Sequence, residues 1–227
     1  RLGGRGSSSV DAYWFVLDRD NLSTGRERRH SIGLRYAGIS GRADWDVESL
    51  YQFGHSGGRD ISAWAASADL GVTLATTPLR PRFGLRFDAG SGDGNPADNR
   101  VGGFHPLFPS GPYFNEANLT SWTNLVALRP NLRIQPDDRL TLQAAVQFKW
   151  RENRMDAVYL GPTAALAATR GNRAREIGQV YTLDATFQMN RNLALRAYYL
   201  RHGAGEAVSL AGGRSVDYAM ASATLRF

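Results

Sequence analysis

The stretch "RPRFGLRFDAG", residues 80–90, alternates polar and apolar side chains along its whole length. A period of two places successive side chains on opposite faces of a β-strand. The apolar set is Pro81, Phe83, Leu85, Phe87 and Ala89, and the polar or small set is Arg80, Arg82, Gly84, Arg86, Asp88 and Gly90. The stretch therefore predicts a strand with one apolar face and one basic, wet face.

The same period recurs along the rest of the chain. Residues 140–151, "LTLQAAVQFKWR", repeat it, with no polar side chain in the set that starts at Leu140. The further candidate strands are 10–19, 29–36, 43–53, 61–72, 120–130, 176–189, 193–202 and 216–227, and only 10–19 is ambiguous in phase. Ten strands of roughly ten residues exceed the ~5–6 residues of soluble sheets and match the ~9–11 residues of transmembrane strands.

The connections between these strands differ in length. Short ones such as "AGISGR" and "IQPDD" alternate with connections that are mostly longer, at 20–28, 54–60, 91–118, 152–175 and 203–215. Short turns at one end and long loops at the other are typical of outer-membrane barrels, as are aromatic residues near the strand ends. The alternative is a soluble β-sandwich, in which the apolar face packs against a second sheet.

The expected fold class is all-β. We predict an antiparallel up-and-down transmembrane β-barrel with about ten strands in this chain, forming a single domain over residues 1–227 in the bacterial outer membrane, in contact with its lipids. The last strand is expected to end at Phe227. The side chains expected to face outward are Phe83, Leu85, Phe87, Leu140, Leu142, Val146 and Phe148.

The composition excludes several other classes of protein. The 227 residues carry a net charge of +6 and contain no cysteine, so a disulfide framework and a thiolate metal site are excluded. No window approaches the ~18 consecutive apolar residues of a membrane-spanning helix. The arginines are spaced by two along strands and interleaved with acids, so we expect no nucleic-acid partner. Four scattered histidines form no triad, and we expect no catalytic residue, no metal site and no cofactor.

Seven segments in chain order resemble the alginate-export family of outer-membrane β-barrels. They are "DAYWFVLDRDN" (11–21), "GLRYAG" (33–38), "WDVESLYQFG" (45–54), "ISAWAASADLG" (61–71), "PRFGLRFDAGSGD" (81–93), "FHPLFPSGPYFNE" (104–116) and "RMDAVY" (154–159). The resemblance implies a passive channel for an anionic polysaccharide, with an arginine-rich lumen. It also implies a larger barrel of roughly eighteen strands, of which this chain resembles the C-terminal part: either N-terminal strands are left out or the chain is a shortened relative.

The basic side chains of the polar faces are the candidate solute-binding residues. Those expected to line the lumen are Arg29, Arg35, Arg80, Arg82, Arg86, Arg129, Lys149, Arg151 and Arg196. Rings of basic side chains favour anions, and the planar guanidinium matches a carboxylate. Arg80, Arg82 and Arg86 are expected to form a ladder on one strand face. The alternative is that the basic residues pair with neighbouring acids and meet no solute.

The segment "GGFHPLFPSGPYF", residues 102–114, holds three prolines and three glycines, which exclude a regular helix or an inner strand. It lies within the long loop 91–118, which we expect to be extracellular. The aromatic and apolar residues expected to form a plug or constriction are Phe104, Leu107, Phe108, Tyr113 and Phe114. The alternative is that they only stiffen the loop.

Two functions remain open. The first is an outer-membrane channel for export or diffusion of an alginate-like anionic polysaccharide or of small anionic solutes. The second is a structural or adhesive barrel with a filled lumen, acting through its outer loops, which a chain of about ten strands favours because so small a barrel is filled by its own side chains.

Overall fold

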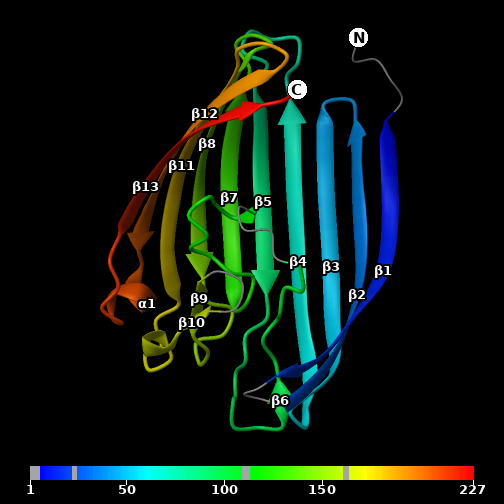
Figure 1. Cartoon of the computed structure of the whole chain (residues 1–227), viewed down its shortest axis with the longest axis vertical. Helices are drawn as coiled ribbons and strands as arrows, with labels where there is room; N and C mark the ends of the chain where they lie inside the picture. The colour runs from blue at the N-terminus through cyan, green and yellow to red at the C-terminus, as the bar shows by residue number, and fades with distance from the viewer. Residues whose placement is uncertain (1–5, 22–24, 109–112, 161–163) are drawn as a thin grey trace.

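The computed structural model describes residues 6–21, 25–108, 113–160 and 164–227. Ten long strands form one sheet, and each long strand pairs antiparallel with the next long strand along the chain (Figure 1). In spatial order they are β1 (Ser7–Asn21), β2 (Gly25–Ser40), β3 (Ala43–Ser56), β4 (Arg59–Thr73), β5 (Arg82–Gly90), β7 (Leu125–Ile134), β8 (Leu140–Trp150), β11 (Glu176–Gln188), β12 (Leu193–Ala204) and β13 (Val216–Leu225). The predicted ten-strand meander is confirmed in number and order.

The remaining elements are short and belong to the connections. They are β6 (Arg100–Val101), which pairs parallel with β4, the hairpin of β9 (Val158–Leu160) and β10 (Ala164–Leu166), the 3-10 helix η2 (Ala167–Thr169) and the helix α1 (Glu206–Ser209). They gather at the lower end of the sheet in Figure 1, which we call the loop end; the opposite end is the turn end. Within the described ranges, no helix is long and apolar enough to cross a membrane.

The sheet is curved but open. β1 and β13 stand at the two ends of the strand order, and in the described part of the chain each pairs with a single neighbour. The all-β antiparallel sheet is therefore established, whereas its closure into a barrel stays a prediction.

Several strand boundaries differ from those expected: β1 and β2 extend beyond 10–19 and 29–36 at both ends, and three further differences have a visible cause. The strand expected at 120–130 is β7, which begins only at Leu125, because the preceding side chains bind the loops: the Thr123 hydroxyl donates to the carbonyl of Phe104 at 2.7 Å. The strand expected at 80–90 begins at Arg82, and the last strand ends at Leu225 rather than at Phe227. Local alternation continues past these ends, but hydrogen bonding to a neighbouring strand does not.

Two predicted long connections are also wrong. The connection expected at 20–28 is mostly strand, since β1 runs to Asn21 and β2 starts at Gly25. Residues 54–60 were expected to form a loop, but β3 runs to Ser56 and β4 starts at Arg59. Gly57 and Gly58 form the two-residue turn between them with φ of 57° and 81°. Positive φ at both central residues is the requirement of a tight hairpin turn, and glycine meets it without strain.

The outer, convex face of the sheet is apolar. Phe83, Leu85 and Phe87 of β5 are 55%, 45% and 40% exposed. The sandwich alternative requires a second sheet over these side chains, and none covers them in the described structure. Leu140, Leu142, Val146 and Phe148 of β8 are half-buried on the same face. The phase of β1, ambiguous in sequence, is decided by its partner: Trp14 lies outward opposite Ile32, and Asp11 lies inward opposite Arg35.

Aromatic side chains occur at two heights on this outer face. Trp14, His30 and Phe53 stack toward the loop end, with ring centroids 5.6 and 5.0 Å apart, and Tyr36 and Trp45 pack together toward the turn end. Six residues of β3 separate Trp45 from Tyr51, which corresponds to roughly 20 Å along a strand. Strand tilt makes the difference in height smaller than this, so both groups fit within the ~25 Å apolar band of outer-membrane sheets and its aromatic borders.

Candidate functional site

Two pairs of arginines face each other across β5 and β7. Arg86 lies directly opposite Arg129, and Arg82 lies directly opposite Arg133. Directly opposed residues of an antiparallel pair share a face, so all four guanidinium groups belong to the inner face. We call these four residues the arginine wall. Like charges in this position destabilise a sheet, which makes the arrangement a candidate for function.

The two strands of the arginine wall differ in how their charge is balanced. Arg82 reaches Asp44 at 2.5 Å and Asp69 at 2.8 Å, and Arg86 reaches Asp88 at 3.2 Å while its guanidinium lies 3.9 Å from the ring centroid of Tyr113. Arg129 and Arg133 have no carboxylate within ion-pair distance among the described residues. Arg129 donates only a long, 3.5 Å hydrogen bond to the Thr182 hydroxyl. The excess positive charge of the wall is therefore on β7.

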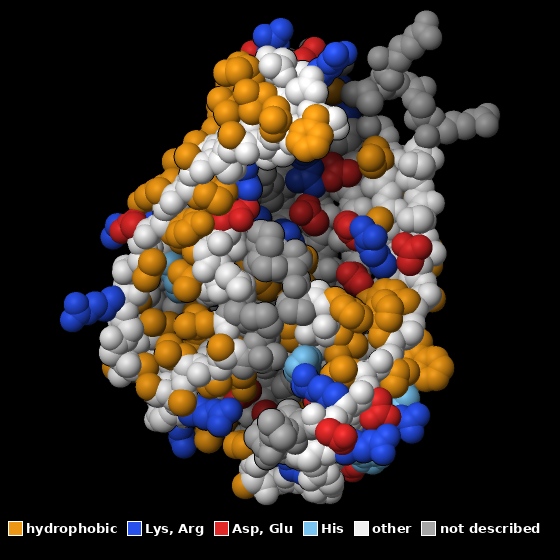
Figure 2. Space-filling model, viewed as in Figure 1, with side chains coloured by type: hydrophobic (Ala, Val, Ile, Leu, Met, Phe, Trp, Pro, Cys, Tyr) orange, Lys and Arg blue, Asp and Glu red, His pale blue; other side chains and the backbone are white. Residues whose placement is uncertain are grey.

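A cavity of about 1170 Å³, the turn-end cavity, lies against the arginine wall. Its charged and amide lining includes Arg42, Asp44, Asp46, Asp69, Arg82, Arg129, Asn131, Arg133 and Gln143. Figure 2 shows basic and acidic side chains together inside this hollow face, with apolar side chains around it. Among the described residues, the cavity thus offers an anion three arginines without a carboxylate partner: Arg129 and Arg133 of the wall, and Arg42.

A plug lies on the inner face, formed by the described residues 102–108 and 113–124, and Figure 1 shows this segment crossing in front of the central strands. Its aromatic core is Phe104, Tyr113, Phe114 and Trp122, with ring centroids 4.8–6.3 Å apart. The bonds that attach it to the sheet include Tyr113 to Asp88 (2.9 Å), Glu116 to Arg196 (2.6 Å), Thr120 to Lys149 (2.9 Å) and the carbonyl of His105 to Gln52 (2.8 Å).

A second cavity, of about 690 Å³, lies between the plug and strands β1 to β4, and we call it the loop-end cavity. Leu107 and Phe108 line it together with Phe104 and Tyr113, whereas Phe114 is buried in the core beside Leu125. Asp46 and Asp69 line both cavities, so the two lie next to each other on the inner face. Four of the five predicted constriction residues thus line this space, and their role in constricting it remains a prediction.

Three further predicted lumen arginines lie in ion pairs. Arg29 is buried and binds Glu27 at 2.8 Å, Arg35 binds both oxygens of Asp46 at 2.6–2.7 Å, and Arg196 binds Asp184 and Glu116 at 2.6 Å. These contacts correspond to the alternative in which the basic residues pair with acids.

The expected ladder of three arginines on one strand is wrong at its first member. Arg80 precedes β5 with a φ of 42° and binds Asp138, in the turn before β8, at 2.8 Å. A left-handed residue cannot continue a strand, so only Arg82 and Arg86 share the β5 face.

Lys149 and Arg151 are buried against the loops and line neither cavity. The Lys149 ammonium donates to the Thr120 hydroxyl at 2.9 Å. Arg151 donates to the carbonyls of Asp156, Thr169, Asn172 and Ala174, at 2.9–3.0 Å for the first three. Arg151 therefore organises the loop that follows β8, a role that spacing alone did not indicate.

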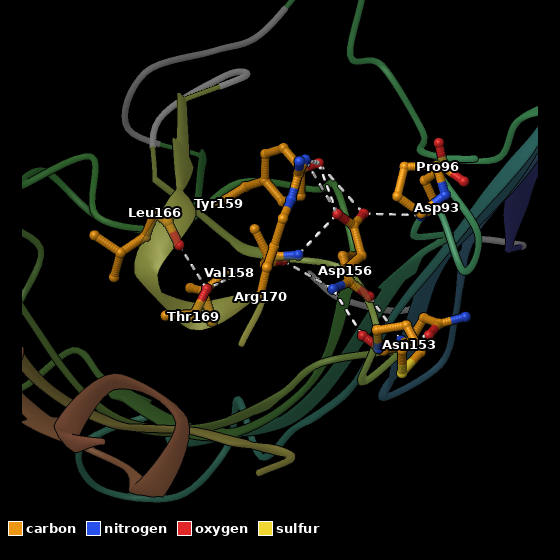
Figure 3. A network of polar contacts seen from close by, with 12 residues as sticks. Asp93, Pro96, Asn153, Asp156, Val158, Tyr159, Leu166, Thr169 and Arg170 are labelled. Carbon is orange, nitrogen blue, oxygen red and sulfur yellow. Dashed lines mark hydrogen bonds and ion pairs between the residues drawn. The ribbon is translucent and has the colours of Figure 1, made fainter. Parts of the chain in front are cut away.

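The loops at the loop end are joined by a polar network centred on Asp156 (Figure 3). The buried Asp156 carboxylate accepts the backbone N–H of Asp93 at 2.8 Å and the hydroxyl of Tyr159 at 3.0 Å, and lies 3.6 Å from Arg170. Burial and the Asp156 charge raise the pKa of Tyr159 to about 12. The network fixes Asp93 against Asp156, which also holds Tyr159 and Arg170.

Sequence reasoning missed Arg133. It lies on the same polar face as Arg129, four residues later, but the strand expected at 120–130 ended before it. Continuing the alternation from Arg129 to Asn131 and Arg133 is the signal that indicates it.

The chain is a meander of long antiparallel strands with an apolar outer face, a charged inner face and a plug that lies on the inner face. This combination is typical of outer-membrane β-proteins. The chain belongs to the alginate-export family, whose model, described as alginate export, matches residues 4–222. This confirms the resemblance inferred from the seven segments and supports a role in alginate export or transport at the level of the family, which is a transport family. No curated protein matches the chain.

Proposed function

We propose that the inner face is the wall of an outer-membrane channel for an anionic polysaccharide of the alginate class or for small anionic solutes. The observation that carries the proposal is the presence of Arg129 and Arg133, without carboxylate partners among the described residues, on the lining of the turn-end cavity. Each uronate unit carries one carboxylate, and a guanidinium fork binds a carboxylate through two parallel hydrogen bonds.

The acidic residues beside the arginine wall favour passage of an anionic polymer over its tight binding. Asp44 and Asp69 already occupy Arg82, so a polymer carboxylate competes for guanidinium groups instead of meeting a bare cationic surface. Conduction requires sites that bind well enough to admit a solute and weakly enough to release it. A wall with two free and two paired arginines meets both requirements.

The test is efflux from vesicles that contain the protein. An oligouronate and a neutral oligosaccharide of equal length are loaded together, and the Arg129→Gln, Arg133→Gln double variant is compared with the unaltered protein. We expect oligouronate efflux to fall roughly tenfold, equivalent to about 1.4 kcal/mol, with neutral efflux unchanged. Arg201→Gln, at an exposed arginine paired with Asp217, is the matched control and should alter neither rate. Equal loss of both solutes would contradict the charge mechanism.

The second candidate is a structural or adhesive outer-membrane protein whose inner face is filled. It is favoured by the ion pairs of Arg29, Arg35 and Arg196 and by the bonds that attach the plug to the sheet. Efflux no faster than from empty vesicles, with a folded protein in the membrane, would favour this second function.

A further inference from the structure

The loop-end cavity differs in chemistry from the turn-end cavity, because aromatic rings form its sides. Tyr13 and Phe15 of β1 have ring centroids 5.0 Å apart, and Phe108 meets Phe15 edge-on at 5.6 Å. Tyr113 and Trp122 of the plug, 4.9 Å apart, line the cavity as well. A volume of about 690 Å³ lies within the ~300–1,000 Å³ typical of small-ligand sites.

The charged side chains of this cavity that are not in ion pairs are acidic. Both of its arginines are occupied, Arg35 by Asp46 and Arg86 by Asp88, and Asp69 is occupied by Arg82. Asp11 and Glu48 have no cationic partner within 4 Å in the residues described; Glu48 accepts only the hydroxyl hydrogen bond of Tyr13. In the strand register, these two acids lie on either side of Arg35.

This combination selects against an anion. A uronate carboxylate entering here meets two carboxylates that form no ion pair within 4 Å among the described residues, and no guanidinium group without a carboxylate partner. A cation gains from both features, because aromatic faces attract positive charge and do so more strongly away from bulk water. The protein already uses this interaction in the same cavity, where the Arg86 guanidinium lies over the Tyr113 ring.

We propose that the loop-end cavity binds a small organic cation with a methylated ammonium group. The rings of Tyr13, Phe15, Phe108 and Trp122 would contact the methyl groups, and Asp11 and Glu48 would supply the opposite charge. A metal ion fits less well: no group of three or more acidic or histidine side chains able to hold one occurs in the part of the chain that the structure describes. Binding at this site does not depend on the proposed channel.

The test compares choline with 3,3-dimethylbutan-1-ol, its uncharged isostere. Binding is measured by titration calorimetry on the folded protein in a maltoside detergent, which carries no ammonium group. Choline should bind saturably and at least tenfold more tightly than the isostere. The Asp11→Asn, Glu48→Gln variant keeps an acceptor for the Tyr13 hydroxyl, and its choline affinity should fall to that of the isostere.

Two further variants separate the site from general effects. Phe15→Leu keeps every charge and removes one ring, so choline affinity should fall several-fold. Asp217→Asn removes an exposed carboxylate on β13 and should leave choline binding unchanged. Near-ultraviolet circular dichroism confirms that each variant is folded. The proposal is overturned if choline does not bind saturably, if the isostere binds as tightly, or if the double variant retains the unaltered affinity.

Discussion

Arg86 of β5 lies directly opposite Arg129 of β7, and of the two only Arg86 has a carboxylate, Asp88, within ion-pair distance in the described structure. The same asymmetry holds for Arg82 and Arg133, since Arg82 alone reaches Asp44 and Asp69. One strand of the pair is therefore electrically balanced and the other is not. Several expected outcomes depend on this difference.

Charge reversal at Arg129 should change ion selectivity. In planar bilayers with a salt gradient, Arg129→Glu should lower or reverse the anion preference, because the Debye length of ~8 Å leaves charges at contact distance incompletely screened. Arg129→Gln should lower it less. An Arg129→Glu protein that folds and keeps the reversal potential of the unaltered protein would remove the main support for an anion path.

Stability should respond in the opposite way at the two strands. Arg82→Gln breaks contacts with two carboxylates, and because both are partly exposed to solvent the free energy of unfolding should fall by only about 1–2 kcal/mol. Arg129→Gln relieves repulsion from Arg86 and should leave stability unchanged or slightly raised. Urea unfolding in lipid vesicles measures both. A larger loss for Arg129→Gln would show that this residue has a structural partner.

The buried charge of Lys149 is expected to lower the free energy of unfolding of the protein. Its ammonium is 1% exposed and has a single neutral acceptor, Thr120, so Lys149→Met should raise the free energy of unfolding by about 1–3 kcal/mol. Arg151→Met is the matched contrast, since it leaves at least four carbonyls without this donor, two of them in buried contacts, and should destabilise the protein. Destabilisation by Lys149→Met would indicate an acidic partner or a binding role for the ammonium group.

Protonation of His105 at low pH is expected to destabilise the packing of the plug against the sheet. Burial, and then the charge of Arg29, lower the pKa of His105 below its usual 6.5, while Glu27 acts in the opposite direction. The neutral ring therefore contributes stability that is present above pH 6.5 and is lost as the pH falls through the folded-state value. Protection factors for hydrogen exchange, which are corrected for the slower intrinsic exchange at low pH, should fall below pH 6.5 for residues 102–108 in the unaltered protein and not in His105→Gln. His55→Gln, at an exposed histidine beside Asp60, should behave like the unaltered protein.

Substitutions on the outer face of β5 test whether this face contacts lipid. Leu85→Arg places a charge on the apolar face and should cost roughly 2–4 kcal/mol if the residue lies near the bilayer midplane. Leu85→Met keeps the side chain apolar and should cost less than about 1.5 kcal/mol. Unfolding from lipid vesicles compares the two, and equal stability would mean that this face does not meet lipid.

Much of the architecture follows from local alternation. A period of two requires no knowledge of a strand's partner, so the sequence predicts ten strands, their order as a meander, and which face of β5 is apolar. It also predicts the plug, because three prolines and three glycines in residues 102–114 are incompatible with any strand or long helix. Strand ends were less predictable, because they depend on where a neighbour stops pairing and on which side chains, such as Thr123, bind a loop instead.

By itself, the sequence determined the all-β class, the strand count, the apolar and charged faces and the family; only the tertiary structure decided which charges are free. Arg29, Arg35, Arg82, Arg129 and Arg196 are equivalent in an alternating pattern, but an ion pair needs a particular carboxylate within 4 Å. That distance depends on register across strands and on the plug, which brings Glu116 to Arg196 and Tyr113 to Asp88 from far along the chain. Alternation is a property of one strand, whereas charge compensation is a property of the assembled sheet.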